Sequence, residues 1–167
     1  GEACARIFAE SGARLILTAR RKEKLLRLAE DLNDQFNSDV VVEGLDVRDS
    51  KAVESFVENL SAPYDSIDIL VNNAGMNWDG VCWKMTEDQW DRVIEVNLKG
   101  YFNFVRQVAP LFKEQKYGKI INITSRGAFR GDAAGQRAGG AAARARQPGD
   151  AGRRLPRPDE EPPPGTP

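Results

Sequence analysis

The sequence IDILVNNAG, residues 67–75, decides the fold of this chain. Its apolar run, Ile69–Val71, shows no alternation, which is typical of a strand buried on both faces in a parallel sheet covered by helices. The next four residues are Asn72, Asn73, Ala74 and Gly75, whose side chains are two amides, a methyl group and a hydrogen atom. Such side chains make poor core, but they let a ligand come close to the backbone. Open α/β sheets bind ligands just past the carboxyl ends of their strands. The stretch therefore predicts a central strand that ends at a binding site.

Strands and helices alternate on both sides of this stretch. Further apolar runs predict strands at 13–18, 40–47 and 118–124. Apolar residues at helical spacing predict helices at 2–11, 21–36, after Asp49, after Thr86 and at 98–112. This order of elements predicts an α/β fold with right-handed crossovers and a parallel sheet.

Single residues predict where several helices begin, end or bend. Asp49 has the chemistry of an N-cap, and the run Thr86–Gln89 has that of a capping box. Gly12 suits the position just past a helix end. We expect Asn97 to interrupt its helix, and Pro110 to kink or divide the long helix around it.

Composition excludes several classes of function. The chain has 167 residues, of which 41% are hydrophobic and 29% charged, and its net charge is −1, so neither nucleic acid nor a membrane is an expected partner. It contains no histidine, which excludes Ser-His-Asp and Cys-His catalysis and histidine-ligated zinc. Two cysteines are too few for a disulfide framework, which fits a cytoplasmic protein. The chain opens inside an amphipathic helix, without the pattern of a signal sequence.

Four motifs in order carry a family resemblance: Asp46 after one strand, Asn72–Gly75 after the next, then Asn97, and Ser125 after the last strand. This series resembles the classical short-chain dehydrogenases/reductases over about residues 1–136. The resemblance implies an incomplete Rossmann-type, doubly wound parallel sheet. It also implies an oxidoreductase that uses a nicotinamide cofactor and no metal.

The resemblance places Gly1 at the last glycine of the family's phosphate-binding loop. The strand and most of the loop before it are then missing from the sequence. After the second strand, Arg20 and Arg21 stand where members that prefer NAD carry an acid. Guanidinium groups there would pair with a 2′-phosphate, so the expected cofactor is NADP rather than NAD. The alternative is that the two arginines begin a solvated basic helix.

The resemblance assigns five further residues to the cofactor. Asp46 would accept a hydrogen bond from the adenine amino group, and Val47 would pack on the ring. Asn73, Ala74 and Gly75 would line the nucleotide, and Asn73 would also tie neighbouring strands together. Without the resemblance, Asp46 is an ordinary carboxylate at a strand end, and the small residues form a turn.

Catalytic roles fall to Asn97 and Ser125. In the family, this asparagine's backbone holds a water in a proton relay, and this serine binds the substrate carbonyl. Alternatively, Asn97 merely distorts a helix and Ser125 starts a turn. The family's Tyr-x-x-x-Lys, which donates the proton, would begin thirteen positions after Ser125. Those positions hold Ala138 and Ala142, so both side chains are absent.

The predicted function is NADP(H)-dependent interconversion of a ketone and a secondary alcohol. Residues 84–125 most resemble the 3-oxoacyl-[acyl-carrier-protein] reductases, whose substrates are acyl thioesters. Residues 61–70 are similar to NADP-dependent 3-hydroxy acid dehydrogenases. From a different class, the chain could be a catalytically inactive fragment that at most binds nucleotide weakly or serves as an interaction module.

Two regions are expected, a partial nucleotide-binding domain at 1–136 and a tail at 137–167. Arg, Ala, Gly and Pro dominate the tail, which cannot bury enough apolar surface to offset its ordering entropy, so we predict that it is disordered. The resemblance implies homo-oligomers joined by two long helices. Residues 101–112 could supply one helix. The other would carry the missing Tyr and Lys, so the expectation does not extend to this chain.

Overall fold

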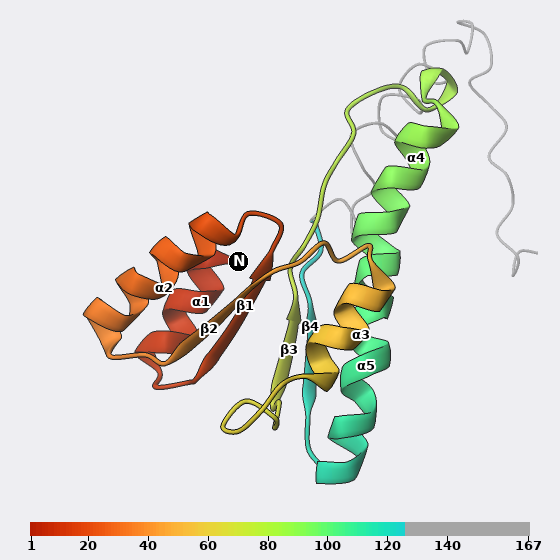
Figure 1. Cartoon of the computed structure of the whole chain (residues 1–167). Helices are drawn as coiled ribbons and strands as arrows, with labels where there is room; N and C mark the ends of the chain where they lie inside the picture. Colours follow the sequence, from red (N-terminus) through yellow and green to blue (C-terminus); the bar gives the residue numbers. More distant parts are fainter. Residues whose placement is uncertain (126–167) are drawn as a thin grey trace, which may run out of the picture. The chain divides into compact units, whose positions relative to one another are not determined.

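The computed structural model describes residues 1–125, where helices and strands alternate along the chain (Figure 1). The predicted tail at 137–167 lies outside the described residues. In chain order the elements are α1 (Glu2–Glu10), β1 (Leu15–Ala19), α2 (Lys22–Phe36), β2 (Val40–Gly44), α3 (Ser50–Glu58), β3 (Ile69–Asn72), the 3₁₀ turn η1 (Cys82–Lys84), α4 (Glu87–Ile94), the π-helical turn η2 (Glu95–Lys99), α5 (Gly100–Gln115) and β4 (Lys119–Asn122).

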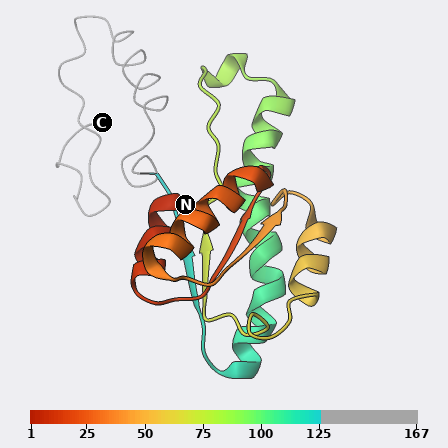
Figure 2. The same cartoon turned by 60° about the vertical axis from the view of Figure 1, so that its left-hand side comes forward.

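The strands form two parallel pairs. β1 pairs with β2 from Leu15 opposite Val40, and β3 pairs with β4 from Ile69 opposite Lys119. All four strand arrows point the same way in Figures 1 and 2, so their carboxyl ends lie toward one end of residues 1–125. The predicted α/β fold with parallel strands is therefore confirmed.

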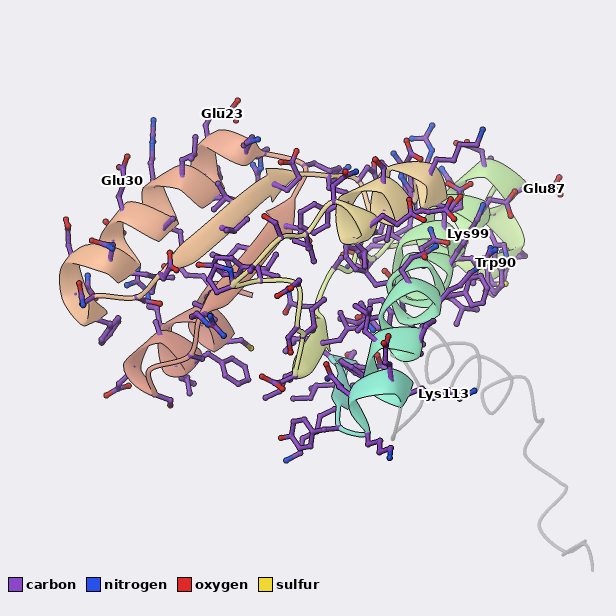
Figure 3. The ribbon with its side chains drawn as sticks, turned by 60° about the horizontal axis from the view of Figure 1, so that its bottom comes forward. Glu23, Glu30, Glu87, Trp90, Lys99 and Lys113 are labelled. Atoms are coloured by element: carbon purple, nitrogen blue, oxygen red, sulfur yellow. The ribbon has the colours of Figure 1, made fainter. Side chains whose placement is uncertain are left out.

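Two clusters of buried apolar side chains hold these elements together. The first joins α1, α2 and the β1–β2 pair, and it is centred on Ala9, Leu15 and Leu32. The second joins α3, α5 and β3, with Val53 and Phe104 at its centre. Charged side chains such as Glu23 and Glu30 stand on the outer face of α2 (Figure 3). α2 therefore buries one apolar stripe in the first cluster and presents a polar face to solvent.

The prediction that Ile69–Val71 is buried on both faces is wrong for the described residues. Ile69 is 36% exposed, and Ile120 on the neighbouring strand is 41% exposed. α5 packs on both strands of this pair and reaches one face, while all of β4 stays exposed. A run without alternation identifies a strand, but whether its second face is covered depends on elements elsewhere in the chain.

The predicted helix ends are confirmed by their hydrogen bonds. The Asp49 carboxylate accepts from the backbone N–H groups of Lys51 and Ala52, at 3.1 and 3.0 Å. Thr86 and Gln89 form the reciprocal capping box. Gly12, just past α1, has φ +77°, a left-handed conformation that glycine adopts without strain. Local chemistry was sufficient to place these boundaries.

Two residues were predicted to disturb the helical stretch from Glu87 to Gln115. Asn97 lies in the π-helical turn Glu95–Lys99, which distorts the helix as predicted. Pro110 does not divide α5, which continues to Gln115. The lost backbone bond is tolerated because Phe104 and Val108, on the buried face of α5, hold the helix in place. No helix of residues 1–125 is long and apolar enough to cross a membrane.

Gly100, the first residue of α5, packs against Val47, which lies in the loop between β2 and α3. A Cβ on Gly100 would lie 2.6 Å from Val47 Cγ2 and 3.0 Å from Val47 Cβ. The Val47 side chain is stiff, so Gly100→Ala forces it to move, at a cost of about 1–3 kcal/mol that exceeds the gain of about 1 kcal/mol in helix propensity. We expect Gly100→Ala to lower the free energy of unfolding by about 1 kcal/mol in chemical denaturation.

Gly80 supplies the matched control, because no atom lies within 4 Å of the Cβ that Gly80→Ala would add. We expect that variant to change the free energy of unfolding by less than about 0.5 kcal/mol. Equal effects from the two substitutions would contradict a tight contact between α5 and Val47.

Candidate nucleotide-binding site

One cavity collects the residues predicted to contact a cofactor. It has a volume of about 860 Å³ and extends to the carboxyl ends of β1, β2 and β3. The predicted residues that line it are Gly1, Arg20, Arg21, Asp46, Val47, Asn73, Ala74 and Gly75. They come from four separate places in the sequence, and parallel strand ends bring them to one rim.

Arg20 and Arg21 lie between the end of β1 and the start of α2. Both are exposed, and neither guanidinium forms an ion pair with a carboxylate of residues 1–125. Arg20 lies close enough to Asp46 for its charge to help lower the pKa of that carboxyl group. The rim of the cavity therefore carries two cations that are available to an anionic ligand.

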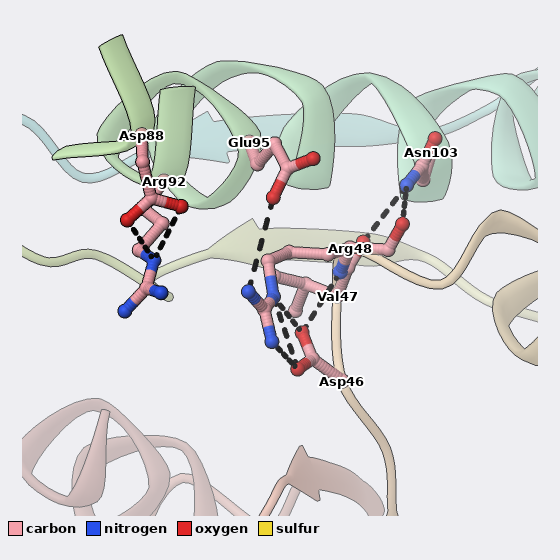
Figure 4. A network of polar contacts seen from close by, with 7 residues as sticks. All are labelled: Asp46, Val47, Arg48, Asp88, Arg92, Glu95 and Asn103. Atoms are coloured by element: carbon pink, nitrogen blue, oxygen red, sulfur yellow. Dashed lines mark hydrogen bonds and ion pairs between the residues drawn. The ribbon is translucent and has the colours of Figure 1, made fainter. Parts of the chain in front are cut away.

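Asp46 is held by a residue that the sequence argument missed. Arg48 Nη2 lies 2.7 Å from Asp46 Oδ2, Arg48 Nε lies 3.1 Å from both carboxylate oxygens, and the Arg48 backbone N–H donates to Oδ1 at 3.0 Å (Figure 4). Arg48 Nη1 also lies 3.8 Å from Glu95 Oε2. Because a carboxylate offers about four acceptor sites, Asp46 keeps capacity for a ligand donor while its side chain is fixed. Asp-x-Arg at a strand end was the available signal.

Hydrogen bonds from the Arg48 guanidinium, more than any other cause, lower the pKa of Asp46 from its usual 3.8. The Asp46 carboxylate in turn raises the pKa of Arg48. A lowered carboxyl pKa stabilises the folded state above pH 3.8, and this contribution is lost as the pH falls through the folded-state value. Asp46 is therefore expected to stay ionised at neutral pH.

Replacing Arg48 with glutamine tests this pair. We expect Arg48→Gln to raise the pKa of Asp46 toward 3.8, as read from the pH dependence of its side-chain ¹³C carboxyl shift. The stability difference between the two proteins should shrink as the pH falls below 3.8. Arg92→Gln is the control, because it removes the separate ion pair with Asp88 (Figure 4). An Asp46 titration that moves equally in both variants would contradict the assignment.

The backbone after Asp46 is anchored to α5. Asn103, which is only 4% exposed, donates from Nδ2 to the Val47 carbonyl at 2.8 Å and to the Arg48 carbonyl at 3.4 Å. A buried amide with these partners fixes the loop between β2 and α3. Val47 is thereby held between α5 and the cavity.

The two asparagines after the central strand have separate partners. Asn72, which is 5% exposed, donates from Nδ2 to Asn122 Oδ1 at 2.9 Å and so ties β3 to β4. Asn73 Oδ1 instead accepts from the Gly1 nitrogen at 3.0 Å. The expected tie between strands therefore belongs to Asn72 in this chain. Asn73 fixes the start of α1 beside the end of β3.

Asn97 lies outside the cavity lining but holds the loop that continues from it. Its Oδ1 accepts from the Met76 N–H and its Nδ2 donates to the Met76 carbonyl, both at 2.8 Å. This reciprocal pair fixes the backbone next to Gly75. The side chain thus has a positioning role that the sequence argument, which considered only the backbone of Asn97, did not anticipate.

Ser125 is the last described residue and does not line the cavity. It follows β4 by three residues. Near it, the Tyr101 hydroxyl donates to the Ile123 carbonyl at 2.8 Å, and burial raises the pKa of Tyr101. The positions expected for the family's Tyr and Lys, 138 and 142, lie outside the described residues. Within residues 1–125, no group of His, Cys, Asp and Glu could hold a metal ion.

Comparison with known proteins gives consistent matches. Residues 1–140 match the family described as short chain dehydrogenase. The 3-oxoacyl-[acyl-carrier-protein] reductase FabG of Thermotoga maritima is 37% identical over 128 residues, which are 75% of this chain and 50% of that protein. The NADP-dependent 3-hydroxy acid dehydrogenase YdfG of Escherichia coli K12 is 36% identical over 126 residues, or 75% and 49%. The chain spans about half the length of the curated relatives it matches.

Solved structures agree. A metagenomic short-chain oxidoreductase in complex with NADP superposes with a TM-score of 0.71 at 36% identity, covering 75% of this chain and 57% of that one. The closed form of serine dehydrogenase complexed with NADP⁺ gives 0.72 at 34% identity, covering 86% and 56%. Both structures hold the nicotinamide cofactor with a 2′-phosphate.

Proposed function

The chain belongs to the short-chain dehydrogenase family, and we propose that the rim of its cavity binds NADP(H) for the interconversion of a ketone and a secondary alcohol. One observation carries the proposal. Every residue that the sequence assigned to the cofactor lines the same cavity at the carboxyl ends of parallel strands. The family and the NADP-bound structures that the chain resembles support the same cofactor.

The preference for NADP(H) over NAD(H) rests on Arg20 and Arg21. No carboxylate follows β1, where an acid would accept a ribose 2′-hydroxyl. Two guanidinium groups that form no ion pair within residues 1–125 stand there instead and suit a 2′-phosphate. The same charge would give no benefit to NAD(H), which lacks that phosphate.

The other rim residues have complementary tasks. Asp46 is fixed by Arg48 and is expected to be ionised at neutral pH. Its carboxylate would accept a hydrogen bond from the adenine amino group, and Val47 would pack against the adenine ring. Asn73, Ala74 and Gly75 present small side chains and backbone to the rest of the nucleotide. Gly1 belongs to the same wall, because a Cβ there would lie 3.0 Å from Asn73 Nδ2.

The proposed chemistry is hydride transfer between the nicotinamide, when bound, and a carbonyl carbon. Ser125 would hold the substrate oxygen that gains charge. The Asn97 side chain would hold the backbone next to Gly75 in place through its two hydrogen bonds with the Met76 backbone. A 3-oxoacyl thioester is the favoured substrate class, since FabG is among the relatives, and a 3-hydroxy acid is the alternative, since YdfG is another.

The proton that must reach the carbonyl oxygen has no assigned donor in this chain, because positions 138 and 142 are alanine. Loss of a positioned general acid costs about 10²–10⁴-fold in rate. We therefore propose that this chain of 167 residues binds nucleotide with negligible turnover. NADPH-dependent reduction of a 3-ketoacyl substrate at an ordinary enzymatic rate would overturn this part of the proposal.

Two small nucleotides test the cofactor assignment without any chemistry. 2′,5′-ADP and 5′-AMP differ only in the 2′-phosphate. We expect calorimetry to give 2′,5′-ADP an affinity at least about tenfold higher, which is the size of one charge-assisted contact. Equal affinities, or no saturable binding of either nucleotide, would contradict NADP(H) as the ligand.

An exposed apolar stripe supports a homo-oligomer as the macromolecular partner. Trp90, Ile94, Leu98 and Phe102 recur every four residues along α4, η2 and α5, with 36–64% of each side chain exposed. Figure 3 shows Trp90 standing clear of the helices. Such stripes mark contact surfaces. We expect Leu98→Lys to shift sedimentation toward a monomer, and an unchanged sedimentation profile would exclude this face.

A further inference from the structure

We infer that Asn103 of α5 is a positioning residue for recognition of the adenine base, because it holds the loop of residues 45–49 where Asp46 and Val47 can bind adenine. The inference rests on the proposed function, which assigns Asp46 and Val47 to the base. Asn103 itself does not line the cavity, so it acts through the loop and touches no ligand.

The loop between β2 and α3 is fixed at both ends by its neighbours. At the first end, the Leu45 N–H donates to a carbonyl of β1 at 3.0 Å. At the other end, the Asp49 N–H donates to the Asp46 carbonyl, also at 3.0 Å. The carbonyls in the middle of the loop, those of Val47 and Arg48, therefore need a donor from elsewhere in the fold.

Asn103 supplies that donor. Its Nδ2 lies 2.8 Å from the Val47 carbonyl oxygen and 3.4 Å from the Arg48 carbonyl oxygen (Figure 4). The side chain is almost fully buried, and a buried amide without a partner is costly, so it keeps to this arrangement. The loop thus takes its position from α5, which packs on α3 and β3.

Two further contacts join this helical stretch to the loop, and neither fixes the two carbonyls. Gly100 leaves room for the Val47 side chain, which lies 2.6 Å from the place of a Cβ. Arg48 Nη1 lies 3.8 Å from Glu95 Oε2, but the two side chains are 39% and 43% exposed, and such exposed ion pairs contribute little. Asn103 is therefore the main link between the loop and α5.

A displaced loop would affect one contact with the base more than the others. Arg48 orients the Asp46 carboxylate through its backbone N–H at 3.0 Å and its guanidinium at 2.7 Å, so a shift of the Arg48 backbone moves this carboxylate. Hydrogen bonds weaken steeply when they lose alignment. Apolar packing on Val47 and the charges of Arg20 and Arg21 depend less on direction. Loss of Asn103 should therefore weaken recognition of the adenine amino group selectively.

Two nucleotides measure this selectivity in calorimetry on the full chain. 2′,5′-ADP carries the amino group of adenine, and purine riboside 2′,5′-bisphosphate has hydrogen in its place. The unaltered chain should bind 2′,5′-ADP at least about tenfold more tightly, which is the size of one hydrogen bond to a carboxylate. In Asn103→Leu, whose side chain has a similar volume but no donor, the ratio should fall below about threefold. An unchanged ratio would overturn the inference.

Val53→Ala is the matched control for a loss of stability. Val53 is fully buried in the cluster that joins α3 to α5, and it does not line the cavity. This variant should keep the ratio of the two affinities within about twofold of its original value. A ratio that falls equally in Val53→Ala and Asn103→Leu would overturn the inference, because general loosening of the fold would then explain it.

A measurement on the unaltered chain tests the inference even where Asn103→Leu does not fold. Coupling between two interactions is reciprocal, so a bound amino group should also stabilise the hydrogen bonds of Asn103. At saturation, 2′,5′-ADP should slow hydrogen exchange of the Asn103 side-chain amide at least about threefold more than purine riboside 2′,5′-bisphosphate. Equal slowing would overturn this inference alone, whereas no saturable binding of 2′,5′-ADP would overturn the proposed function as well.

Discussion

Replacing Arg20 and Arg21 together with alanine should weaken binding of 2′,5′-ADP by about 10- to 100-fold and leave binding of 5′-AMP within about twofold. Each charge-assisted hydrogen bond to a phosphate contributes about 1.5–3 kcal/mol, and solvent reduces this contribution at exposed side chains. Both arginines are exposed and lack ion pairs in the described part of the chain, so their removal breaks no ion pair there. Isothermal titration calorimetry measures the two affinities.

The matched control is the double replacement of Arg27 and Lys113, two exposed cations that do not line the cavity, with alanine. It removes the same total charge but leaves the pair at the end of β1. A merely general electrostatic attraction would lower the affinity for 2′,5′-ADP equally in both double variants. In that case Arg20 and Arg21 would belong to a solvated helix start, the alternative that the sequence left open.

Leu32→Ala should cost about 2–5 kcal/mol of the free energy of unfolding, the largest stability effect that we expect from a single truncation. Leu32 has no exposed surface, and it packs in the cluster that joins α1, α2 and β1. Its removal leaves a cavity that the surrounding helices fill only in part. Urea denaturation followed by circular dichroism measures the change.

Leu26, on the same helix, is the control because it is 46% exposed. Leu26→Ala should change the free energy of unfolding by less than about 0.5 kcal/mol. If the two leucine variants were equally stable, the cluster formed by α1, α2 and β1 would not hold that part of the fold together.

The sequence predicted well those features that local chemistry determines. A carboxylate at Asp49 and the Thr86–Gln89 pair can satisfy the free N–H groups of a helix start within three residues. The strands could be placed because runs such as Leu15–Leu17 have no polar interruption. Their parallel order followed from the helices between them.

Features that depend on distant partners could not be predicted. Nothing near Asn72 in the sequence indicates that it meets Asn122, fifty residues later. Arg48 has no local feature that shows it will also meet Glu95 on a distant helical turn. The exposure of Ile69 depends on which elements cover β3, and the survival of α5 past Pro110 depends on its packing. These contacts arise only once the strands have brought remote segments together.

The site was predicted in part. Spacing and resemblance nominated the residues of the rim, and these line one cavity. The side-chain roles of Asn97 and Asn103 escaped prediction, because each bonds the backbone of a loop that is far away in the sequence. In both cases an amide fixes the chain next to a nominated residue, Gly75 or Val47. For Asn103, its position as a polar residue on the buried face of α5 is the signal to examine.

Chemical-shift mapping of NADPH on the full chain tests the central claim most directly. The account predicts saturable shifts of the backbone amides of Arg20, Asp46, Asn73 and Gly75, with NADH producing them only at concentrations at least about tenfold higher. Shifts that gather on another surface, or NADH that matches NADPH at these amides, would contradict a site for NADP(H) at the carboxyl ends of the strands.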